Sequence, residues 1–214
     1  MARERGPARL LVDRPWPDPA VRAVWVVEVT DTAVVLGSTQ SPETVVAGQP
    51  ALRRRSGGGA VLVEPGGLVW VDVLVPAGDA LWAPDVGRAF AWLGRTWAEA
   101  LGDVGVREAR VHDGPLVTTP WSRLVCFAGL GPAEVTVAGA KVVGLCQRRT
   151  RAGALFQCAA LLDWRPERLL DRLVLPADQR DRAATDLAGV ARPLDGVAPD
   201  ALVAAFLDRL PTSN

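Results

Sequence analysis

Short runs of β-branched and apolar residues recur along the first three quarters of this chain, each bounded by turn residues. They lie at residues 23–29, 33–36, 59–63, 68–75, 106–111, 134–137, 141–146 and 154–162, with a shorter apolar run at 124–127. Runs of this length between turn residues are typical of strands. A short Ala-Gly-Ala turn joins 134–137 to 141–146, which predicts a β-hairpin. Hairpins pair antiparallel, so the chain is predicted to form mixed, largely antiparallel β-sheets.

Helical patterns are confined to one central segment and to the C-terminal part. Between residues 84 and 102 large apolar side chains recur at helical spacing, with Asp85 as the expected N-cap and Gly102 as the expected end. Strands with flanking helices and no regular alternation predict an α+β fold in a single domain over residues 1–214. Further helices are predicted at 166–173, 178–190 and 200–210, within a helical C-terminal part at 166–214, whereas the Arg- and Pro-rich residues 1–20 are expected to be an irregular lead-in.

Charge and cysteine content exclude several classes of protein. Lys and Arg together number 24, as do Asp and Glu, so neither nucleic-acid nor membrane-surface binding is expected. No apolar run is long enough to span a membrane, and the first residues lack a signal-peptide core. Three cysteines without CxxC spacing argue against a disulfide framework and favour a cytoplasmic protein. A single histidine, His112, leaves too few ligands for zinc, so no metal site is predicted.

Lys141 is the only lysine beside 23 arginines. A buried lysine can lose its proton, whereas arginine effectively cannot. In a chain that uses arginine for nearly every other cation, this lysine indicates a position where the amine itself is needed. The alternative is that one lysine persists by chance on a solvated hairpin.

The segment RRRSGGG, residues 53–59, combines basic side chains with consecutive glycines. Glycine lets the backbone adopt positive φ and approach a ligand closely. Successive N–H groups then form an anion-binding concavity, and adjacent arginines complement phosphate. The alternative is a flexible basic turn. No GKS/T follows, so this is not a Walker loop.

Cys126 lies in the apolar segment LVCFAGLG. A nucleophilic cysteine needs a cation or base beside it, and Lys141 is a better candidate than His112, which stands at the expected end of a strand. A desolvated lysine and a thiol can share one proton. The alternative is a small core residue, which is also what we expect of Cys146 and Cys158.

In their order along the chain, these motifs resemble the lipoate–protein ligase and octanoyltransferase superfamily. RRRSGGGAV with GGLVWVDVLVP resembles its arginine–glycine signature, GAKVVGLCQRRTRAGALFQCAALLD resembles its lysine hairpin, and VVLGSTQ resembles the strand and turn before them. The resemblance covers residues 33–163. It implies a biotin/lipoyl ligase-like catalytic domain that attaches octanoyl or lipoyl groups to a lysine of a carrier domain, such as the glycine cleavage H protein or a dehydrogenase E2.

The family has two mechanisms, and the resemblance implies either. Octanoyltransferases take the acyl chain from acyl carrier protein as a cysteine thioester, without ATP. One branch carries that cysteine in a CF sequence where Cys126 stands. By this resemblance Cys126 would be the nucleophile, and Lys141 would be its proton partner and the cation that stabilises the oxyanion. Ligases use lipoate with ATP and Mg, and Lys141 would hold the acyl-adenylate. We prefer the transferase, and neither mechanism implies a tightly bound cofactor. The residues expected at the substrate are Arg53, Arg54, Ser56, Gly57, Gly58, Gly59, Ala60, Val61, Gly144, Gln147, Arg148 and Gln157.

Three departures from the family pattern keep a third hypothesis open. Val63 and Cys158-Ala159 stand where family members carry histidines, and no helix with an Asn-x-Ala-x-Asp/Glu pattern precedes the first strand. The pocket is therefore expected to be more open, or to be completed by a partner or an altered N-terminus. An acyl- or carrier-binding protein without turnover is the remaining alternative.

Overall fold

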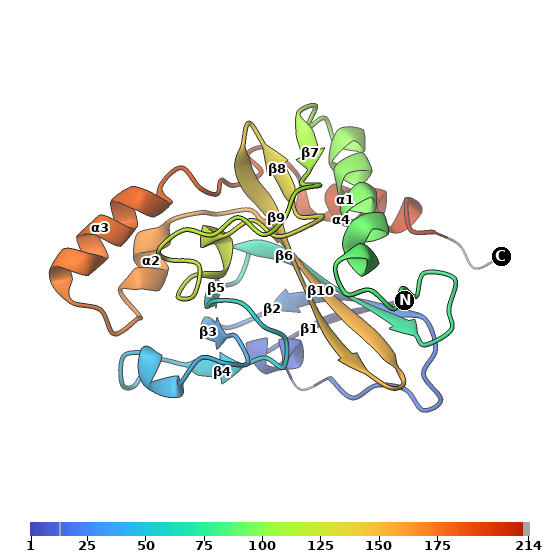
Figure 1. Ribbon diagram of the computed structural model, residues 1–214, viewed down its shortest axis with the longest axis horizontal. Helices are drawn as coiled ribbons and strands as arrows, with labels where there is room; N and C mark the ends of the chain where they lie inside the picture. The colour runs from blue at the N-terminus through green and yellow to red at the C-terminus, as the bar shows by residue number, and fades with distance from the viewer. Residues whose placement is uncertain (13, 212–214) are drawn as a thin grey trace.

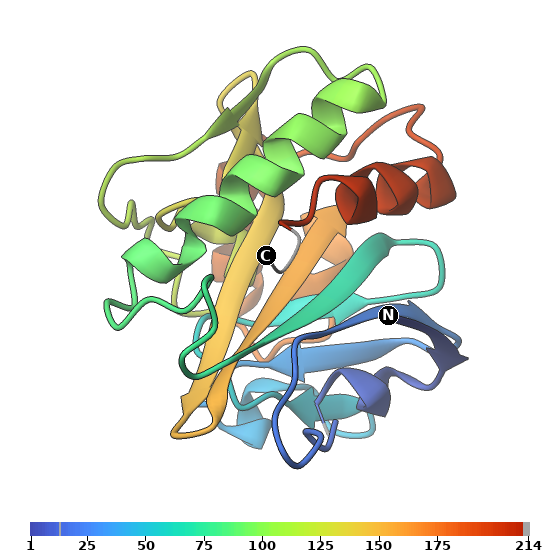
Figure 2. The ribbon, with the colours of Figure 1, turned by 90° about the vertical axis from the view of Figure 1, so that its right-hand side faces the viewer.

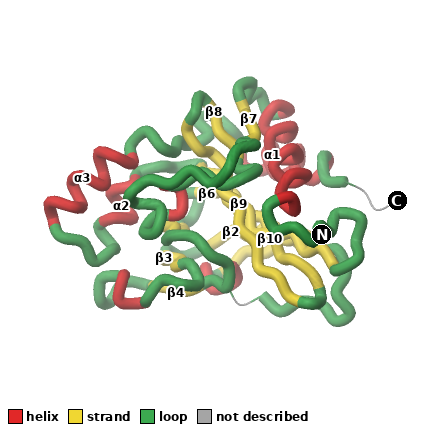
Figure 3. Tube along the Cα trace, in the orientation of Figure 1, coloured by secondary structure: helices red, strands yellow, loops and turns green. Residues whose placement is uncertain are grey.

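The computed structural model describes residues 1–12 and 14–211, and no helix within them is long and apolar enough to cross a membrane. The chain forms two β-sheets with helices at the periphery (Figures 1 and 3). The smaller sheet has the order β4-β3-β5, from β3 (Ala33–Leu36), β4 (Ala51–Arg53) and β5 (Val61–Val63). The larger sheet has the order β1-β2-β6-β10-β9-β8-β7, from β1 (Ala2–Gly6), β2 (Ala23–Val29), β6 (Leu68–Pro76), β7 (Ala109–Val111), β8 (Val135–Val137), β9 (Ala140–Thr150) and β10 (Gly153–Leu161).

Antiparallel pairing dominates the larger sheet, and the smaller sheet has one antiparallel and one parallel pair. Among the described strands, only the β1–β2 and β3–β4 pairs are parallel. The predicted hairpin at 134–146 is present as β8 and β9, and the other strand-like runs, apart from 124–127, also contain strands. The predicted α+β fold with largely antiparallel sheets is confirmed.

The strands β6, β10 and β9 form the centre of the larger sheet. All nine residues of β10 are buried, and they pair with β6 from Gly153↔Pro76 to Leu161↔Leu68. Side chains alternate along a strand, so successive residues of β6 face opposite sides. Val71 packs in the core beneath the helices, whereas Trp70 packs in a second core on the other face.

Two helices, α1 (Ala91–Asp103) and α4 (Pro199–Asp208), cover one face of this sheet (Figure 2). Trp97 of α1 stacks on Phe206 of α4 with ring centroids 4.2 Å apart, and both side chains are fully buried. The opposite face of the sheet is thereby left to the smaller sheet, the N-terminal segment and the loop before β8.

The central helix begins later than its apolar pattern predicts. Residues 84–85 form a bend and 86–87 a turn, a 3-10 turn follows at Arg88–Phe90, and α1 begins at Ala91. Asp85 does accept the N–H of Arg88 at 2.8 Å, but it caps the 3-10 turn rather than the α-helix. The carbonyl of Val86 accepts a 2.9 Å hydrogen bond from the side-chain amide of Gln147 in strand β9. This bond holds the backbone at Val86 outside the helix.

The N-terminal lead-in was predicted to be irregular, and this prediction is wrong for its first half. Ala2–Gly6 form β1, an edge strand parallel to β2, and Ala8–Leu11 form a 3-10 turn. The sequence ARERG lacks the apolar alternation of a half-buried strand. Edge strands tolerate such charged residues, because one side of the ladder remains exposed. Pairing with β2 therefore decides the conformation here.

Strand β9 is longer than expected and its turn is shorter. It continues through Arg148 and Arg149, which pair with Leu155 and Ala154 of β10, so these arginines do not lie in the turn. The apolar run 124–127, in contrast, does not form a strand: Val125 makes a single parallel bridge with Ala60, and Cys126–Ala128 form a 3-10 turn. Both differences concern expected site residues: Arg148 lies in strand β9, and Cys126 lies in a 3-10 turn.

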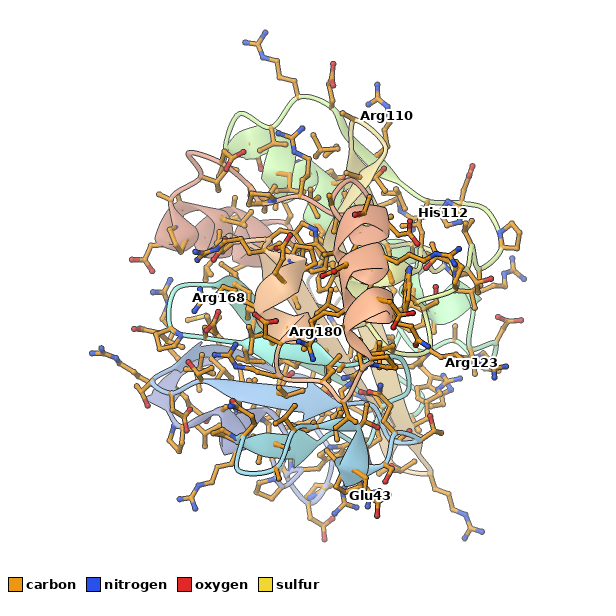
Figure 4. All side chains as sticks on the ribbon, turned by 90° about the vertical axis from the view of Figure 1, so that its left-hand side faces the viewer. Glu43, Arg110, His112, Arg123, Arg168 and Arg180 are labelled. Carbon is orange, nitrogen blue, oxygen red and sulfur yellow. The ribbon has the colours of Figure 1, made fainter. Side chains whose placement is uncertain are left out.

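The remaining helices lie on the side of the smaller sheet. These are α2 (Pro166–Leu170) and α3 (Ala177–Leu187), both shorter than predicted. Leu170 of α2 and Leu187 of α3 share a buried core with Leu36 of β3. Figure 4 shows this side of the molecule, with Arg168 and Arg180 labelled on it.

Candidate functional site

The glycine-rich loop between β4 and β5 is organised around a buried cation. Arg54 is 2% exposed, and its guanidinium donates to the carbonyls of Val35 at 3.1 Å, Gly57 at 2.7 Å and Gly59 at 2.9 Å. Gly58 adopts a φ of +95°, a conformation that side chains rarely allow. The arginine thus binds the carbonyl side of the loop.

The N–H side of the same loop is left without protein acceptors. Within the described residues, the N–H groups of Gly57, Gly58 and Gly59 donate no hydrogen bond. A side chain at Gly59 would lie 2.6 Å from the backbone of Val125, so the loop is in close contact with the segment that carries Cys126. Free backbone N–H groups in such a loop can bind an anion or a developing oxyanion.

Cys126 begins a 3-10 turn that packs directly on this loop. Its N–H donates to the carbonyl of Ala60 at 2.8 Å, next to the glycines. Its Sγ lies 4.0 Å from the position that a Cβ would take at Gly58. The expected nucleophile and the expected substrate loop are therefore adjacent.

Lys141 is buried, and its ammonium group reaches the same turn. The residue is 3% exposed, and Nζ donates to the carbonyl of Cys126 at 3.3 Å and to the carbonyl of Gly129 at 3.0 Å. Nζ also lies 2.6 Å from Oε2 of Glu134, which is itself 5% exposed. The fold thus brings Lys141 into contact with Cys126, although fifteen positions separate them in the sequence. Glu134 is a residue that the sequence patterns did not single out.

A small cavity lies where these elements meet. Its volume is about 20 Å³, and its lining includes Arg54, Val61, Trp70, Cys126, Phe127, Gly144, Leu145, Cys146, Gln157 and Ala159. A space of this size holds roughly one water molecule and no acyl chain. Gly144 is needed here, since a Cβ at this position would lie 3.2 Å from Cζ of Phe127 and 3.3 Å from Cε of Lys141.

A chain of polar side chains crosses the cavity wall. Ser56 donates its hydroxyl proton to Oε1 of Gln157 at 3.0 Å, and its oxygen lies 3.2 Å from Sγ of Cys146. Because the serine has one proton, the thiol of Cys146 is the donor of that second contact. Burial raises the pKa of the Cys146 thiol. Cys146 was expected in the core but lines the cavity, whereas Cys158 is fully buried as expected.

Asp72 continues this chain beneath the cavity and was not expected at the site. Its Oδ1 accepts Trp70 Nε1 at 2.7 Å and Gln157 Nε2 at 3.4 Å. Its Oδ2 lies 3.3 Å from Nε of Arg14. Burial raises the pKa of Asp72 to about 6, although the Trp70 hydrogen bond and the Arg14 charge both oppose that shift. The interruption of an apolar strand by one aspartate was the available sequence signal.

The N-terminal strap, defined here as residues 7–12 and 14–16, contacts side chains at the site. Gln157 Nε2 donates to the carbonyl of Leu11 at 2.8 Å. The guanidinium of Arg14 makes two bonds to Glu4, of 2.9 and 2.8 Å, in addition to its contact with Asp72. Trp16 lies under the guanidinium of Arg148, with 5.4 Å between Cζ of the arginine and the centroid of the ring. The strap therefore contacts Gln157 of the cavity wall and Asp72 beneath it.

The other expected site residues are dispersed. Gln147 donates to Val86 near α1 rather than toward Cys126, and Arg53 is exposed on β4. His112 Nε2 contacts the carbonyl of Pro115 in its own loop, at 2.8 Å (Figure 4). Val63, where a family histidine was expected, is fully buried in the core with Trp70.

A second cavity, of about 40 Å³, adjoins the first. Phe127 and Val61 line both, and the lining of the second also includes Trp164 and Arg168. The Phe127 ring lies 5.9 Å from Trp164 and 4.9 Å from Nζ of Lys141. Phe127 is therefore the partition between the two spaces.

The fold is that of a lipoyl ligase-like catalytic domain. The family model of the lipoyl protein ligase A/B catalytic domain matches residues 14–204. The chain belongs to this family. The first part of the strap precedes the match.

Solved structures show the same fold at low identity. A bi-partite lipoate protein ligase from Thermoplasma acidophilum has a TM-score of 0.68 and 19% identity, over 88% of this chain and 69% of that chain. A lipoate-protein ligase A bound with ATP has a TM-score of 0.64 and 19% identity, over 88% of this chain and 70% of that chain. LipL1 of P. falciparum in complex with lipoate has a TM-score of 0.56 and 15% identity, over 88% of this chain and 48% of that chain. Among curated proteins, none matches this chain.

Proposed function

We propose that this protein is an acyltransferase of protein lipoylation that carries an octanoyl or lipoyl group as a thioester on Cys126. The observation that supports this most is the meeting of three groups at one turn. The Cys126 thiol faces the glycine loop, the loop N–H groups have no acceptor in the described chain, and the Lys141 ammonium lies 3.3 Å from the Cys126 carbonyl. Nucleophile, oxyanion donors and cation are the groups that acyl transfer requires.

The chemistry has two steps. The Cys126 thiolate attacks the carbonyl carbon of the donor thioester, the C–S bond to the donor breaks, and the donor leaves as a thiolate. The neutral amine of the acceptor lysine then attacks the acyl-enzyme, the C–S bond to Cys126 breaks, and Cys126 returns as a thiolate. The proton that the amine nitrogen loses passes to the departed donor thiolate through solvent. At both tetrahedral stages the carbonyl oxygen gains charge, which the glycine N–H groups and the Lys141 cation stabilise. Lys141 was expected to be a proton partner as well, and its ammonium forms a 2.6 Å ion pair with Glu134.

Acyl carrier protein is the proposed donor and a lipoyl carrier domain the proposed acceptor. The structure of the Thermoplasma ligase was described together with its E2 lipoyl domain, which supports the second choice. A cytoplasmic location, the single-domain organisation and the roles of the substrate residues remain predictions of the same hypothesis. The closed pocket implies that the strap or Phe127 moves when the donor binds.

An ATP-dependent ligase is the second candidate, and the buried ammonium of Lys141, which this mechanism requires, is compatible with it. A structural relative was solved bound with ATP. In this mechanism Lys141 is essential and Cys126 is dispensable. A binding protein without turnover is the remaining alternative.

Intact mass separates these functions. The protein is mixed with octanoyl-acyl carrier protein without ATP, in parallel with Cys126→Ser and with Cys146→Ser as the matched thiol control. We expect an octanoyl adduct that is lost in Cys126→Ser and retained in Cys146→Ser. No adduct without ATP, but transfer of lipoate to a lipoyl domain with ATP and Mg, would establish the ligase. Binding of octanoate without either activity would leave the non-enzymatic function.

A further inference from the structure

Every proton of the Lys141 ammonium is already engaged by the protein. An ammonium group has three N–H donors. One is directed to Glu134 Oε2 at 2.6 Å, one to the carbonyl of Gly129 at 3.0 Å and one to the carbonyl of Cys126 at 3.3 Å. Two of the three acceptors belong to the turn that carries the expected nucleophile. Lys141 therefore holds this turn in place and also puts a positive charge beside it.

Glu134 determines the direction of these bonds. Its carboxylate also accepts the N–H of Gly131 at 2.7 Å and the N–H of Leu145 at 3.0 Å. Three donors from two segments, the loop after the Cys126 turn and strand β9, thus meet at one buried carboxylate. A buried ammonium with its carboxylate in hydrogen-bond contact has one favoured orientation, because any other leaves a charge unpaired.

We propose that Glu134 is a positioning residue for acyl transfer and acts through Lys141. It holds the ammonium in the orientation from which the other two N–H groups fix the carbonyls of Cys126 and Gly129, and this sets the place of the Cys126 thiol. The longest of the three contacts, to the Cys126 carbonyl, is the one that passes to the substrate oxygen as charge develops there. This inference rests on the proposed function.

A purely structural Glu134 is the competing explanation. Its bonds to Gly131 and Leu145 join the loop to β9 without any help from Lys141. In that case the effect of Glu134→Gln would be the same whether or not Lys141 is present. If Glu134 acts through Lys141, the effect disappears once the lysine is removed, which a double-mutant cycle measures.

The experiment compares Glu134→Gln, Lys141→Met and the double variant, with Asp103→Asn as control. Asp103 pairs with Arg209 at the surface, 2.8 Å apart, far along the chain from the site. Two quantities are measured: hydrogen exchange of the peptide covering residues 124–131, and the rate of octanoyl adduct formation at Cys126. We expect each single variant to speed exchange and to slow adduct formation at least tenfold. The double variant should match Lys141→Met in both measurements, and Asp103→Asn should match the wild type.

Three outcomes would overturn the proposal. The first is that Glu134→Gln has the same exchange and the same rate of adduct formation as the wild type. The second is that the effects of Glu134→Gln and Lys141→Met on these quantities multiply in the double variant. The third is that Asp103→Asn changes them as much as Glu134→Gln does. If Glu134→Gln fails to fold because it leaves Lys141 unpaired, the double variant has no unpaired charge and its comparison with Lys141→Met decides. If the wild type forms no adduct, the proposed function fails, while the exchange data still test the role of Glu134.

Discussion

The side-chain amide of Gln157 donates a 2.8 Å hydrogen bond to the carbonyl of Leu11, 146 positions earlier in the chain. Gln157 is one of the residues expected to meet the substrate, and the strap occupies it. The strap also places Trp16 beneath Arg148, another expected substrate residue. With the strap in place the cavity holds roughly one water molecule. The strap contacts therefore lie beside a cavity that is too small for an acyl chain.

Arg14→Gln is expected to loosen the strap and expose the site thiols. The change removes the bonds to Glu4 and leaves Asp72 without its cation, at a cost of about 3 kcal/mol in the free energy of unfolding. Maleimide labelling followed by intact mass should show faster modification of Cys126 and Cys146. Cys158 is fully buried, so a third label would report unfolding instead.

Arg9→Gln is the matched control for this measurement. Arg9 lies on the same strap but is exposed and takes part in no ion pair among the described residues. We expect its labelling to equal that of the wild type. Equal labelling of Arg14→Gln and wild type, with both folded, would show that Arg14 does not hold the strap.

Asp72 should make stability fall as the pH rises from about 4 to about 6. Burial raises the pKa of this carboxyl from 3.8 to about 6 in the folded protein, so the folded state holds the proton more tightly than the unfolded state. The stabilising contribution is complete below the unfolded value and is lost as the pH passes the folded value. The full difference corresponds to about 3 kcal/mol.

Urea unfolding of wild type and Asp72→Asn between pH 4 and pH 7 measures this effect. Asparagine does not titrate, so the variant should gain up to about 3 kcal/mol relative to wild type across that range. Arg14 keeps its bonds to Glu4 in both proteins. A constant difference between the two proteins would contradict the raised pKa.

Gly144→Ala is expected to disturb Phe127 and Lys141. Its Cβ would lie 3.2 Å from the Phe127 ring and 3.3 Å from Cε of Lys141, both buried. Overpacking of this kind costs about 1–3 kcal/mol. Thermal denaturation measures it, with Gly102→Ala as control: that position in α1 has open space, and the change should stabilise by about 1 kcal/mol. Adding Phe127→Leu should restore part of the loss, and no restoration would place the strain elsewhere.

Arg54→Lys should destabilise the glycine loop although it keeps the charge. A lysine cannot reproduce the planar fork that binds the carbonyls of Val35, Gly57 and Gly59. We expect a loss of about 3 kcal/mol in the free energy of unfolding, because buried carbonyls lose their donor. Arg53→Lys, at the exposed neighbouring position, should leave stability unchanged in the same urea titration. Equal stability of both variants would mean that the loop does not depend on Arg54.

The strands and helices with clear apolar periodicity were predictable from sequence. The hairpin at 134–146 and the long strand containing Trp70 follow from turn residues and alternation, which are local properties. Segments whose conformation depends on a distant partner were not predictable. The charged edge strand β1 needs β2, and the late start of α1 results from side chains of β9 that bind the backbone before it.

The same division holds for the site. The sequence by itself determined the residue types: one lysine, a cysteine before a hairpin, and a glycine-rich loop with arginines, in an order that identified the family. Only the tertiary structure decided that Glu134 pairs with Lys141, that Cys146 lines the cavity with Asp72 beneath it, and that the N-terminal strap binds Gln157. Burial and hydrogen-bond geometry arise from segments far apart in the chain, so no local pattern specifies them.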